Sequence, residues 1–129
     1  MNLHAGMELP ELRMGPISRK SLALFAGASG DHQPSHIDID AARAKGRDDV
    51  IVHGMLIMAL MGRMLTDLAP QDRIRSFTTR FVAVTPVHGE PCCNGRVTAV
   101  VDGLATLEIE ARLADGKLVA QGEAVIALA

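Results

Sequence analysis

The chain has 129 residues, of which 48% are hydrophobic and 22% are charged, and these proportions are typical of a globular protein rather than a disordered or fibrous one. Its formal charge of −2 and its lack of Trp and Tyr remove the basic surface and the stacking side chains with which proteins hold nucleic acid, so we expect no nucleic-acid partner. One domain over residues 1–129 is long enough to bury a single core.

The two cysteines and the hydropathy pattern indicate the compartment. Cys92 and Cys93 are adjacent, and adjacent cysteines rarely meet the geometry of an unstrained disulfide, so both are expected to be reduced thiols. The chain opens without a basic and apolar secretory leader, and its longest apolar run, Met55 to Met61, is too short for the roughly 20 residues that span a bilayer. We therefore expect a cytoplasmic protein without a membrane segment.

Gly and Pro residues divide the first third of the chain into short elements. They leave room for a strand near Leu12–Ile17 and a helix over Ser21–Ser29, which Gly30 is suited to end because Gly adopts a left-handed conformation without steric cost. The helix cannot continue through Asp31–His36, because Pro34 lacks an N–H group and restricts the residue before it. The sequence therefore predicts a turn that carries titratable side chains.

Two further helices are predicted before the middle of the chain. Asp38 is expected to cap a short helix over Ile39–Lys45, and Gly46–Asp49 is expected to form a variable flap. From Gly54 to Leu68, apolar residues occur on almost all sides until Arg63, which is typical of a helix that is buried on most of its surface. Other elements must cover this helix.

The second half of the chain alternates apolar and polar residues between turn signals, which predicts an antiparallel meander. Leu104–Leu113 is the clearest segment, and Asp102-Gly103 and Asp115-Gly116 favour tight hairpins. A helix followed by such a meander predicts an α+β fold in which an antiparallel sheet wraps around one long buried helix. Periodicity alone does not distinguish among the folds in which a sheet covers a single helix.

The most specific signal is the sequence F-A-G-A-S-G-D-H-Q-P-S-H at residues 25–36, followed by V-H-G-M at residues 52–55. Together these segments resemble the MaoC-like family of (R)-specific enoyl-CoA hydratases and 3-hydroxyacyl dehydratases. That family's pattern has an aromatic residue, Ser/Thr-Gly-Asp, Asn-Pro and His, and later a His-Gly pair that opens the central helix. Asp31, Pro34 and His36 stand at the family spacing, whereas Gln33 and Ser35 replace its Asn and its aliphatic residue.

The resemblance covers nearly the whole chain and implies a hot-dog fold, a hydro-lyase reaction on an acyl-CoA thioester, and a dimer that holds its substrate between protomers. The second subunit is either identical or related. The resemblance also implies that Asp31 activates water, that His36 orients this water or protonates carbon, and that the Gly54 backbone N–H is the oxyanion donor. Four more residues are expected to contact the substrate, namely His53, Met55, Ser29 and Gln33.

The chemistry explains these residue types independently of the resemblance. Adding water across the 2,3-double bond of a thioester requires a base that takes a proton from water and an acid that delivers one to the α-carbon. A carboxylate and an imidazole on one turn can share this work. The first N–H groups of a helix and the positive end of its dipole suit a thioester carbonyl that becomes an enolate oxygen.

We expect neither a cofactor nor a metal ion. His32 and His36 could join Asp31 around a metal, but the sequence offers no second cluster that would complete a tetrahedral ligand set. The helical stripe of methionines at positions 55, 58, 61 and 64 is more typical of a core than of a substrate tunnel.

Two alternative functions remain open at this point. A hot-dog acyl-CoA thioesterase would need a carboxylate on the buried helix, where only Asp67, near the C-terminal end, is available. A non-catalytic acyl-binding subunit of a heteromeric dehydratase fits the departures at Gln33 and Ser35, whereas the intact Asp31–His36 pair argues against it.

Overall fold

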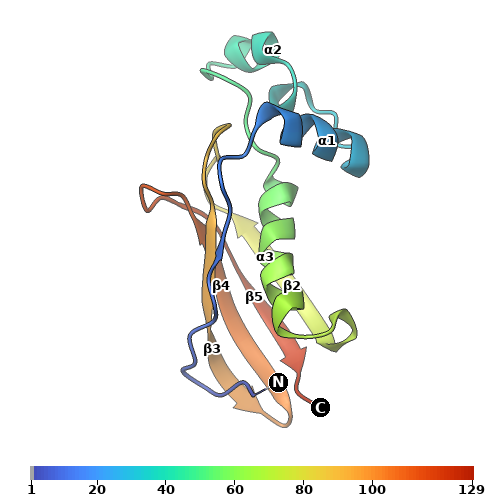
Figure 1. Ribbon diagram of the computed structural model, residues 1–129, viewed down its shortest axis with the longest axis vertical. Helices are drawn as coiled ribbons and strands as arrows, with labels where there is room; N and C mark the ends of the chain where they lie inside the picture. Colours follow the sequence, from blue (N-terminus) through green and yellow to red (C-terminus); the bar gives the residue numbers. More distant parts are fainter. Residues whose placement is uncertain (1) are drawn as a thin grey trace.

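The computed structural model describes residues 2–129, and it consists of one curled sheet, one long helix packed on it, and a group of short helices at one end (Figure 1). The strands are β1 (Leu12–Arg13), β2 (Ile74–Phe81), β3 (Cys92–Val101), β4 (Leu104–Arg112) and β5 (Leu118–Ala127). The helices are α1 (Arg19–Ser29), η1 (Pro34–His36), α2 (Ile39–Ala44), α3 (Gly54–Leu68) and η2 (Gln71–Arg73). Within residues 2–129 no helix combines the length and hydrophobicity needed to cross a bilayer.

The sheet is antiparallel throughout, with the strand order β1-β3-β4-β5-β2. β3, β4 and β5 form the predicted meander. β2 does not extend the meander beside β3, its neighbour along the chain, but pairs with β5 and lies at the opposite edge of the sheet. A Cβ atom on Gly122 in β5 would collide with the backbone carbonyl of Thr78 in β2, so glycine permits the close approach with which the sheet curls.

The turn between β3 and β4 follows the sequence prediction. Asp102 (φ 51°) and Gly103 (φ 75°) both have left-handed backbones and join the paired residues Val101 and Leu104, as a two-residue hairpin requires. The Asp115-Gly116 pair closes a three-residue hairpin, in which the Leu113 N–H donates to the Lys117 carbonyl (2.9 Å), the Gly116 N–H donates to the Leu113 carbonyl (2.8 Å), and Gly116 is left-handed (φ 88°). The expectation of tight hairpins is therefore correct for both pairs, although the second loop is one residue longer.

Helix α3 has the bounds that the sequence predicts, and the sheet covers one of its sides. Ile57, Leu60, Met61, Met64 and Leu65 are buried in the core. On the sheet, alternate residues of β4 provide the facing apolar layer, namely Ala105, Leu107, Ile109 and Ala111. Burying one such leucine contributes about 2 kcal/mol.

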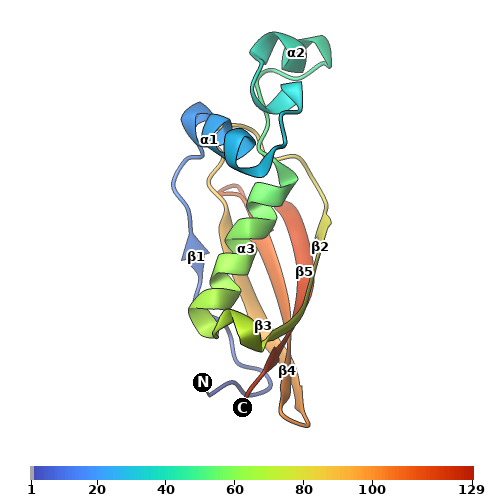
Figure 2. The same ribbon diagram turned by 90° about the vertical axis from the view of Figure 1, so that its right-hand side faces the viewer.

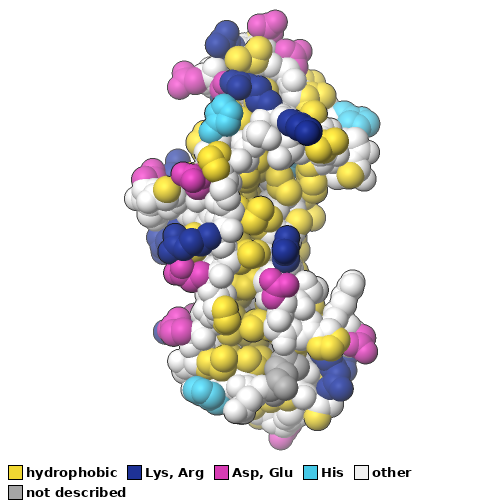
Figure 3. Space-filling view, in the orientation of Figure 1, with side chains coloured by type: hydrophobic (Ala, Val, Ile, Leu, Met, Phe, Trp, Pro, Cys, Tyr) yellow, Lys and Arg dark blue, Asp and Glu magenta, His cyan; other side chains and the backbone are white. Residues whose placement is uncertain are grey.

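The opposite side of α3 is less covered than the sequence analysis expected. Met55 is 53% exposed, and a band of hydrophobic side chains runs along this face of the molecule over the position of α3 (Figure 3). The reason is that the sheet curls around one side of the helix without closing over the other. The methionine stripe accordingly divides, with Met61 and Met64 in the core and Met55 at the surface.

α1, η1 and α2 gather over the beginning of α3, at the end of the molecule opposite both chain termini, whereas η2 directly follows the other end of α3 (Figure 2). α1 begins two residues earlier than predicted, because Ser18 caps it by accepting a hydrogen bond from the Ser21 N–H. It ends at Gly30 (φ 76°), as expected. Asp38 caps α2, as predicted, whereas the predicted strand at residues 12–17 is only the two-residue β1.

Candidate active site

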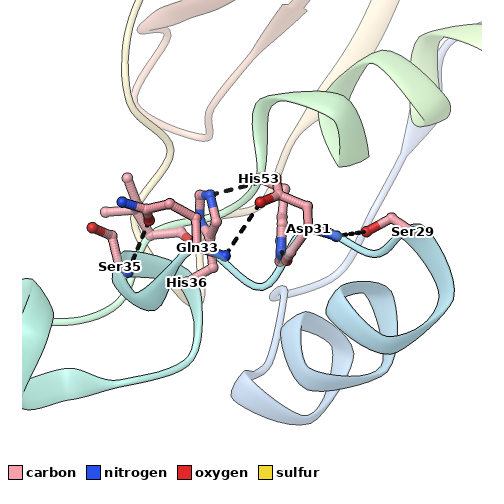
Figure 4. A network of polar contacts seen from close by, with 7 residues as sticks. Ser29, Asp31, Gln33, Ser35, His36 and His53 are labelled. Carbon is pink, nitrogen blue, oxygen red and sulfur yellow. Dashed lines mark hydrogen bonds and ion pairs between the residues drawn. The ribbon is translucent and has the colours of Figure 1, made fainter.

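The turn after α1 presents the Asp31 carboxylate. The Asp31 N–H donates a hydrogen bond to Ser29 Oγ (3.1 Å), and the Gln33 N–H donates one to Asp31 Oδ1 (3.3 Å) (Figure 4). Asp31 Oδ1 is thus used to hold the local backbone, a common role of Asp in turns. The second oxygen, Oδ2, is left free to act on another group.

Gln33 and Ser35 stabilise the same turn. Gln33 Oε1 accepts a hydrogen bond from the Ser35 N–H (2.8 Å), which caps the short helix η1, and the Ser35 side chain is buried. The Ser35 carbonyl accepts the Ile51 N–H (3.0 Å) and joins η1 to the segment before α3. The side-chain oxygens of Ser29 and Gln33, which were expected to contact substrate, therefore make hydrogen bonds within the turn.

His36 lies beside Asp31, with its Nε2 atom 3.9 Å from Asp31 Oδ2. Its Nδ1 atom is 2.7 Å from the Ile51 carbonyl oxygen, and a carbonyl can only accept a hydrogen bond, so Nδ1 must carry a hydrogen. In the neutral ring, Nε2 then presents a lone pair toward the carboxylate. The His36 side chain is 12% exposed and that of Asp31 is 43% exposed, so the pair is open to solvent on the Asp31 side.

His53, the N-cap residue of α3, is buried behind His36. The two imidazole rings stack with centroids 3.9 Å apart and planes 23° apart, and the Phe25 ring packs against His53 at 4.8 Å in an edge-on arrangement. His53 is 0% exposed, which places it out of reach of solvent. Burial first, and then the neighbouring His36, lower the pKa of His53 below 6.5. This position differs from the expected contact with substrate.

The start of α3 completes the site. The Gly54 N–H is one of the first donors of a 15-residue helix, which have no acceptor within the helix, and no other acceptor contacts it within residues 2–129. Gly54 and His36 line one cavity of about 320 Å³. The remaining walls are almost entirely apolar and come from the segment before α3, from α3, from the end of β2 and the residues after it, and from β5, namely Ile51, Val52, Ile57, Phe81, Val82, Ala83, Val84, Thr85 and Val119. Asp31 does not itself line the cavity, which meets the pair on the His36 side; we call it the dyad cavity.

The apolar walls were not predicted from the sequence, although a signal for them was present. The run F-V-A-V at residues 81–84 begins at the last residue of β2 and precedes Pro86, and three of these side chains are large and exposed. Exposed apolar residues beside a polar pair are typical of a binding surface. The role of Ile51 had no such signal, because it acts through its backbone carbonyl. Met55, which was predicted at the substrate, does not line the dyad cavity.

A larger hollow of about 770 Å³ lies over the middle of the sheet, and no residue of the Asp31–His36 pair lines it. Its walls carry charges of both signs, and Arg96 is paired there with Glu108 at 3.1 Å. The dyad cavity is smaller, yet it combines apolar walls with a few converging polar groups, which is typical of ligand sites.

Asp31, His36 and His53 each offer an atom within 4.8 Å of the others, so the possibility of a metal site must be considered. The two rings are nearly parallel, which directs their nitrogen lone pairs along similar planes rather than toward one point. His36 Nδ1 and His53 Nε2 are also hydrogen-bonded to carbonyl oxygens. Zn²⁺ needs ligands that converge tetrahedrally, so these residues do not fit such an ion.

Comparison with known proteins connects this geometry to a family. Residues 5–90 match the model of the MaoC like domain. Over 110 residues, 83% of each protein, the chain is 36% identical to the 3-oxo-4,17-pregnadiene-20-carboxyl-CoA hydratase beta subunit of Mycobacterium tuberculosis. It is 35% identical over 123 residues to the 3-hydroxyacyl-thioester dehydratase Z of the same species, which covers 82% of this chain and 80% of that protein.

The fold is also similar to a solved structure, the (R)-hydratase from A. caviae involved in PHA biosynthesis. The TM-score is 0.88 and the sequence identity 28%, with 98% of each chain covered. This likeness confirms the predicted hot-dog fold, and the matched domain includes the Asp31–His36 turn and the start of α3. The chain therefore belongs to the MaoC-like family of hydratases and dehydratases.

Proposed function

We propose that the protein adds water to a 2-enoyl-CoA thioester to give the (R)-3-hydroxyacyl-CoA, or catalyses the reverse dehydration. The observation that carries the proposal is the 3.9 Å separation between His36 Nε2 and Asp31 Oδ2 at the edge of an apolar cavity. This separation is too long for a direct hydrogen bond and leaves room for one water molecule that bonds to both atoms.

The tautomer of His36 favours the activation of such a water molecule. Asp31 Oδ2 and the Nε2 lone pair both accept hydrogen bonds, so both water protons point toward the protein and an oxygen lone pair points toward substrate. As the water oxygen bonds to the β-carbon, Asp31 takes one proton, and a proton from the pair passes to the α-carbon. The two groups end in their starting protonation states, as a lyase requires.

In this proposal the thioester carbonyl faces the start of α3. Addition of water at the β-carbon moves negative charge onto the carbonyl oxygen, and the free Gly54 N–H with the positive end of α3 would stabilise that charge. The apolar walls of the dyad cavity would hold the acyl chain next to Gly54 and His36. We name no residue that binds the CoA group.

A thioesterase receives less support from the geometry. Its reaction would need a carboxylate on α3 near the carbonyl, but Asp67 is exposed and lies in the last turn of that helix, at the end opposite Gly54. The intact Asp31–His36 arrangement similarly favours a catalytic chain over a purely acyl-binding subunit.

We also propose that the protein acts as an oligomer. The open side of α3 and the free edge of β2 lie next to the exposed cavity residues Phe81, Val82 and Val84, so a second subunit could cover them together. One relative is named a beta subunit, and the partner is therefore either a second copy of this chain or a related chain.

The proposal is tested by incubating the protein with enoyl-CoA esters of increasing chain length and with a steroid 20-carboxyl-CoA ester, which the name of one relative indicates. Loss of absorbance from the conjugated double bond measures hydration, and chiral analysis identifies the product. Asp31→Asn and His36→Ala should each lower kcat by roughly 10²- to 10⁴-fold. Their effects should be far from additive, because the two groups act on one water.

The chain offers matched controls for both substitutions. Asp40→Asn and His32→Ala change exposed residues of the same types, on α2 and beside Asp31 respectively, and should leave kcat near the wild-type value. An (S) product would contradict the proposed orientation of water. Release of free CoA without loss of the double bond would support the thioesterase instead.

A further inference from the structure

We infer that His53 is a positioning residue that connects the three reacting parts of the site, because its side chain holds the Asp31 backbone and the His36 ring while its own backbone leads into Gly54. The inference rests on the proposed hydration for its kinetic test. The contacts themselves do not depend on the identity of the substrate.

The first contact fixes the His53 tautomer. Nε2 lies 3.2 Å from the Asp31 carbonyl oxygen, which can only accept, so Nε2 carries the hydrogen. The other nitrogen, Nδ1, is buried and has no hydrogen-bond partner within residues 2–129. A buried polar atom without a partner is costly and uncommon in folded proteins, so the contact with the Asp31 carbonyl is kept although it leaves Nδ1 unpaired.

The second contact restrains His36. The Ile51 carbonyl holds the His36 ring at Nδ1, which still allows the ring to tilt, and the stacked His53 ring blocks that tilt on one face. Phe25 packs against His53 and keeps it in place. The His36 Nε2 lone pair is thereby directed toward Asp31 Oδ2.

The same side chain sets the position of the carboxylate. Its hydrogen bond to the Asp31 carbonyl joins the turn after α1 to the N-terminus of α3, two segments 22 residues apart in the chain. The distance between the water-activating pair and the Gly54 N–H therefore depends on His53. Because His53 is 0% exposed and absent from the walls of the dyad cavity, it acts through these neighbours and not on the substrate.

Two substitutions separate the two contacts. His53→Phe keeps a flat ring against His36 but removes the N–H donor, whereas His53→Gln keeps a donor for Asp31 but removes the ring. Each should lower kcat on the order of 10- to 100-fold, because small displacements of reacting groups have effects of this size. KM should stay near the wild-type value. His53→Ala removes both contacts and should cause the largest decrease in kcat.

Leu65→Val is the control for a general loss of packing, because Leu65 is fully buried on α3 but lies about three turns from Gly54. It should lower the melting temperature without the loss of kcat. Unchanged kcat in both His53→Phe and His53→Gln would overturn the inference. A rise in KM with constant kcat would also overturn it, since that result indicates direct substrate contact.

A measurement without substrate distinguishes this inference from the proposed function. Imidazole nitrogen NMR of the wild-type protein at neutral pH should show His53 protonated at Nε2 and neutral His36 protonated at Nδ1. In His53→Phe, the His36 signals should shift or broaden as the ring gains freedom. If no enoyl thioester is hydrated, the proposed function fails, and these spectra still decide the role of His53. A wild-type spectrum with the hydrogen on His53 Nδ1 would refute the inference.

Discussion

The Phe81 ring lies directly over Gly54, where a Cβ atom would contact three carbons of the ring at 3.4 Å. The ring is 47% exposed, so it can move by the few tenths of an ångström that one methyl group requires. Gly54→Ala should therefore fold and retain the backbone N–H. Gly54→Pro removes this N–H at the first position of α3, where proline is otherwise tolerated, and should lower kcat on the order of 10²- to 10³-fold.

Steady-state kinetics and circular dichroism of both Gly54 variants check this prediction. The loss should appear in kcat more than in KM, because the donor would act on charge that develops during the reaction. If the Ala and Pro variants were equally inactive while folded, the role of Gly54 would be to allow close packing under Phe81, and the carbonyl would need a different donor.

The free edge of β2 predicts self-association or assembly with a related chain. Light scattering should give a mass above that of one 13.7 kDa chain at assay concentrations. Ser76 and Thr78 are exposed on this edge strand, and replacing both with Glu should shift the protein toward monomers by placing like charges at the contact. The matched double variant Thr98→Glu and Val100→Glu, at exposed positions of β3 on the side of the sheet away from β2, should not cause this shift. An active wild-type monomer would contradict the prediction.

The two cysteines should differ in reactivity although they are adjacent. Burial raises the pKa of the Cys93 thiol to about 11, and burial also raises the pKa of Cys92, whose side chain is partly accessible. At neutral pH little thiolate forms at either site, and Cys93 is in addition shielded by the sheet. Mass spectrometry after alkylation should therefore show slow modification of Cys92 and modification of Cys93 only in denaturant. Fast labelling of Cys93 in the native protein would show that β3 opens locally.

His53 should make the protein less stable in mild acid. Its pKa is below 6.5 in the folded state, so between pH 6.5 and that lower value the unfolded chain binds a proton that the folded chain does not. Stability should therefore fall as the pH decreases from 6.5. The melting temperature of His53→Gln should depend less steeply on pH over this interval, and equal slopes in both proteins would contradict the prediction.

Asp49 affects the pH dependence of stability over a separate, more acidic pH interval. The Val50 N–H and the Arg19 guanidinium lower the pKa of its carboxyl below 3.8, so its contribution to stability is complete above pH 3.8 and is lost as the pH falls further. Scans between pH 5 and pH 8 therefore report on the histidine without interference from this ion pair.

The sequence was sufficient for the elements that depend on local patterns. The bounds of α3, the caps at Gly30 and Asp38, and the β3–β4 turn follow from helix-ending, helix-capping and turn chemistry. The position of β2 in the sheet does not follow from local patterns, because its pairing with β5 depends on contacts between segments far apart in the chain. The burial of His53 escaped prediction for the same reason, since Phe25, Asp31 and His36 approach it only after the chain has folded.

The strand order also constrains how the protein forms during synthesis. β2 follows α3 immediately in the chain, yet within residues 2–129 its strand pairing is with β5, whose last residue is Ala127. On the ribosome, both edges of β2 therefore remain unpaired until β5 has emerged. Unpaired strand edges of this kind favour aggregation while folding is incomplete. Deleting β5 would leave β2 without the strand that it pairs with.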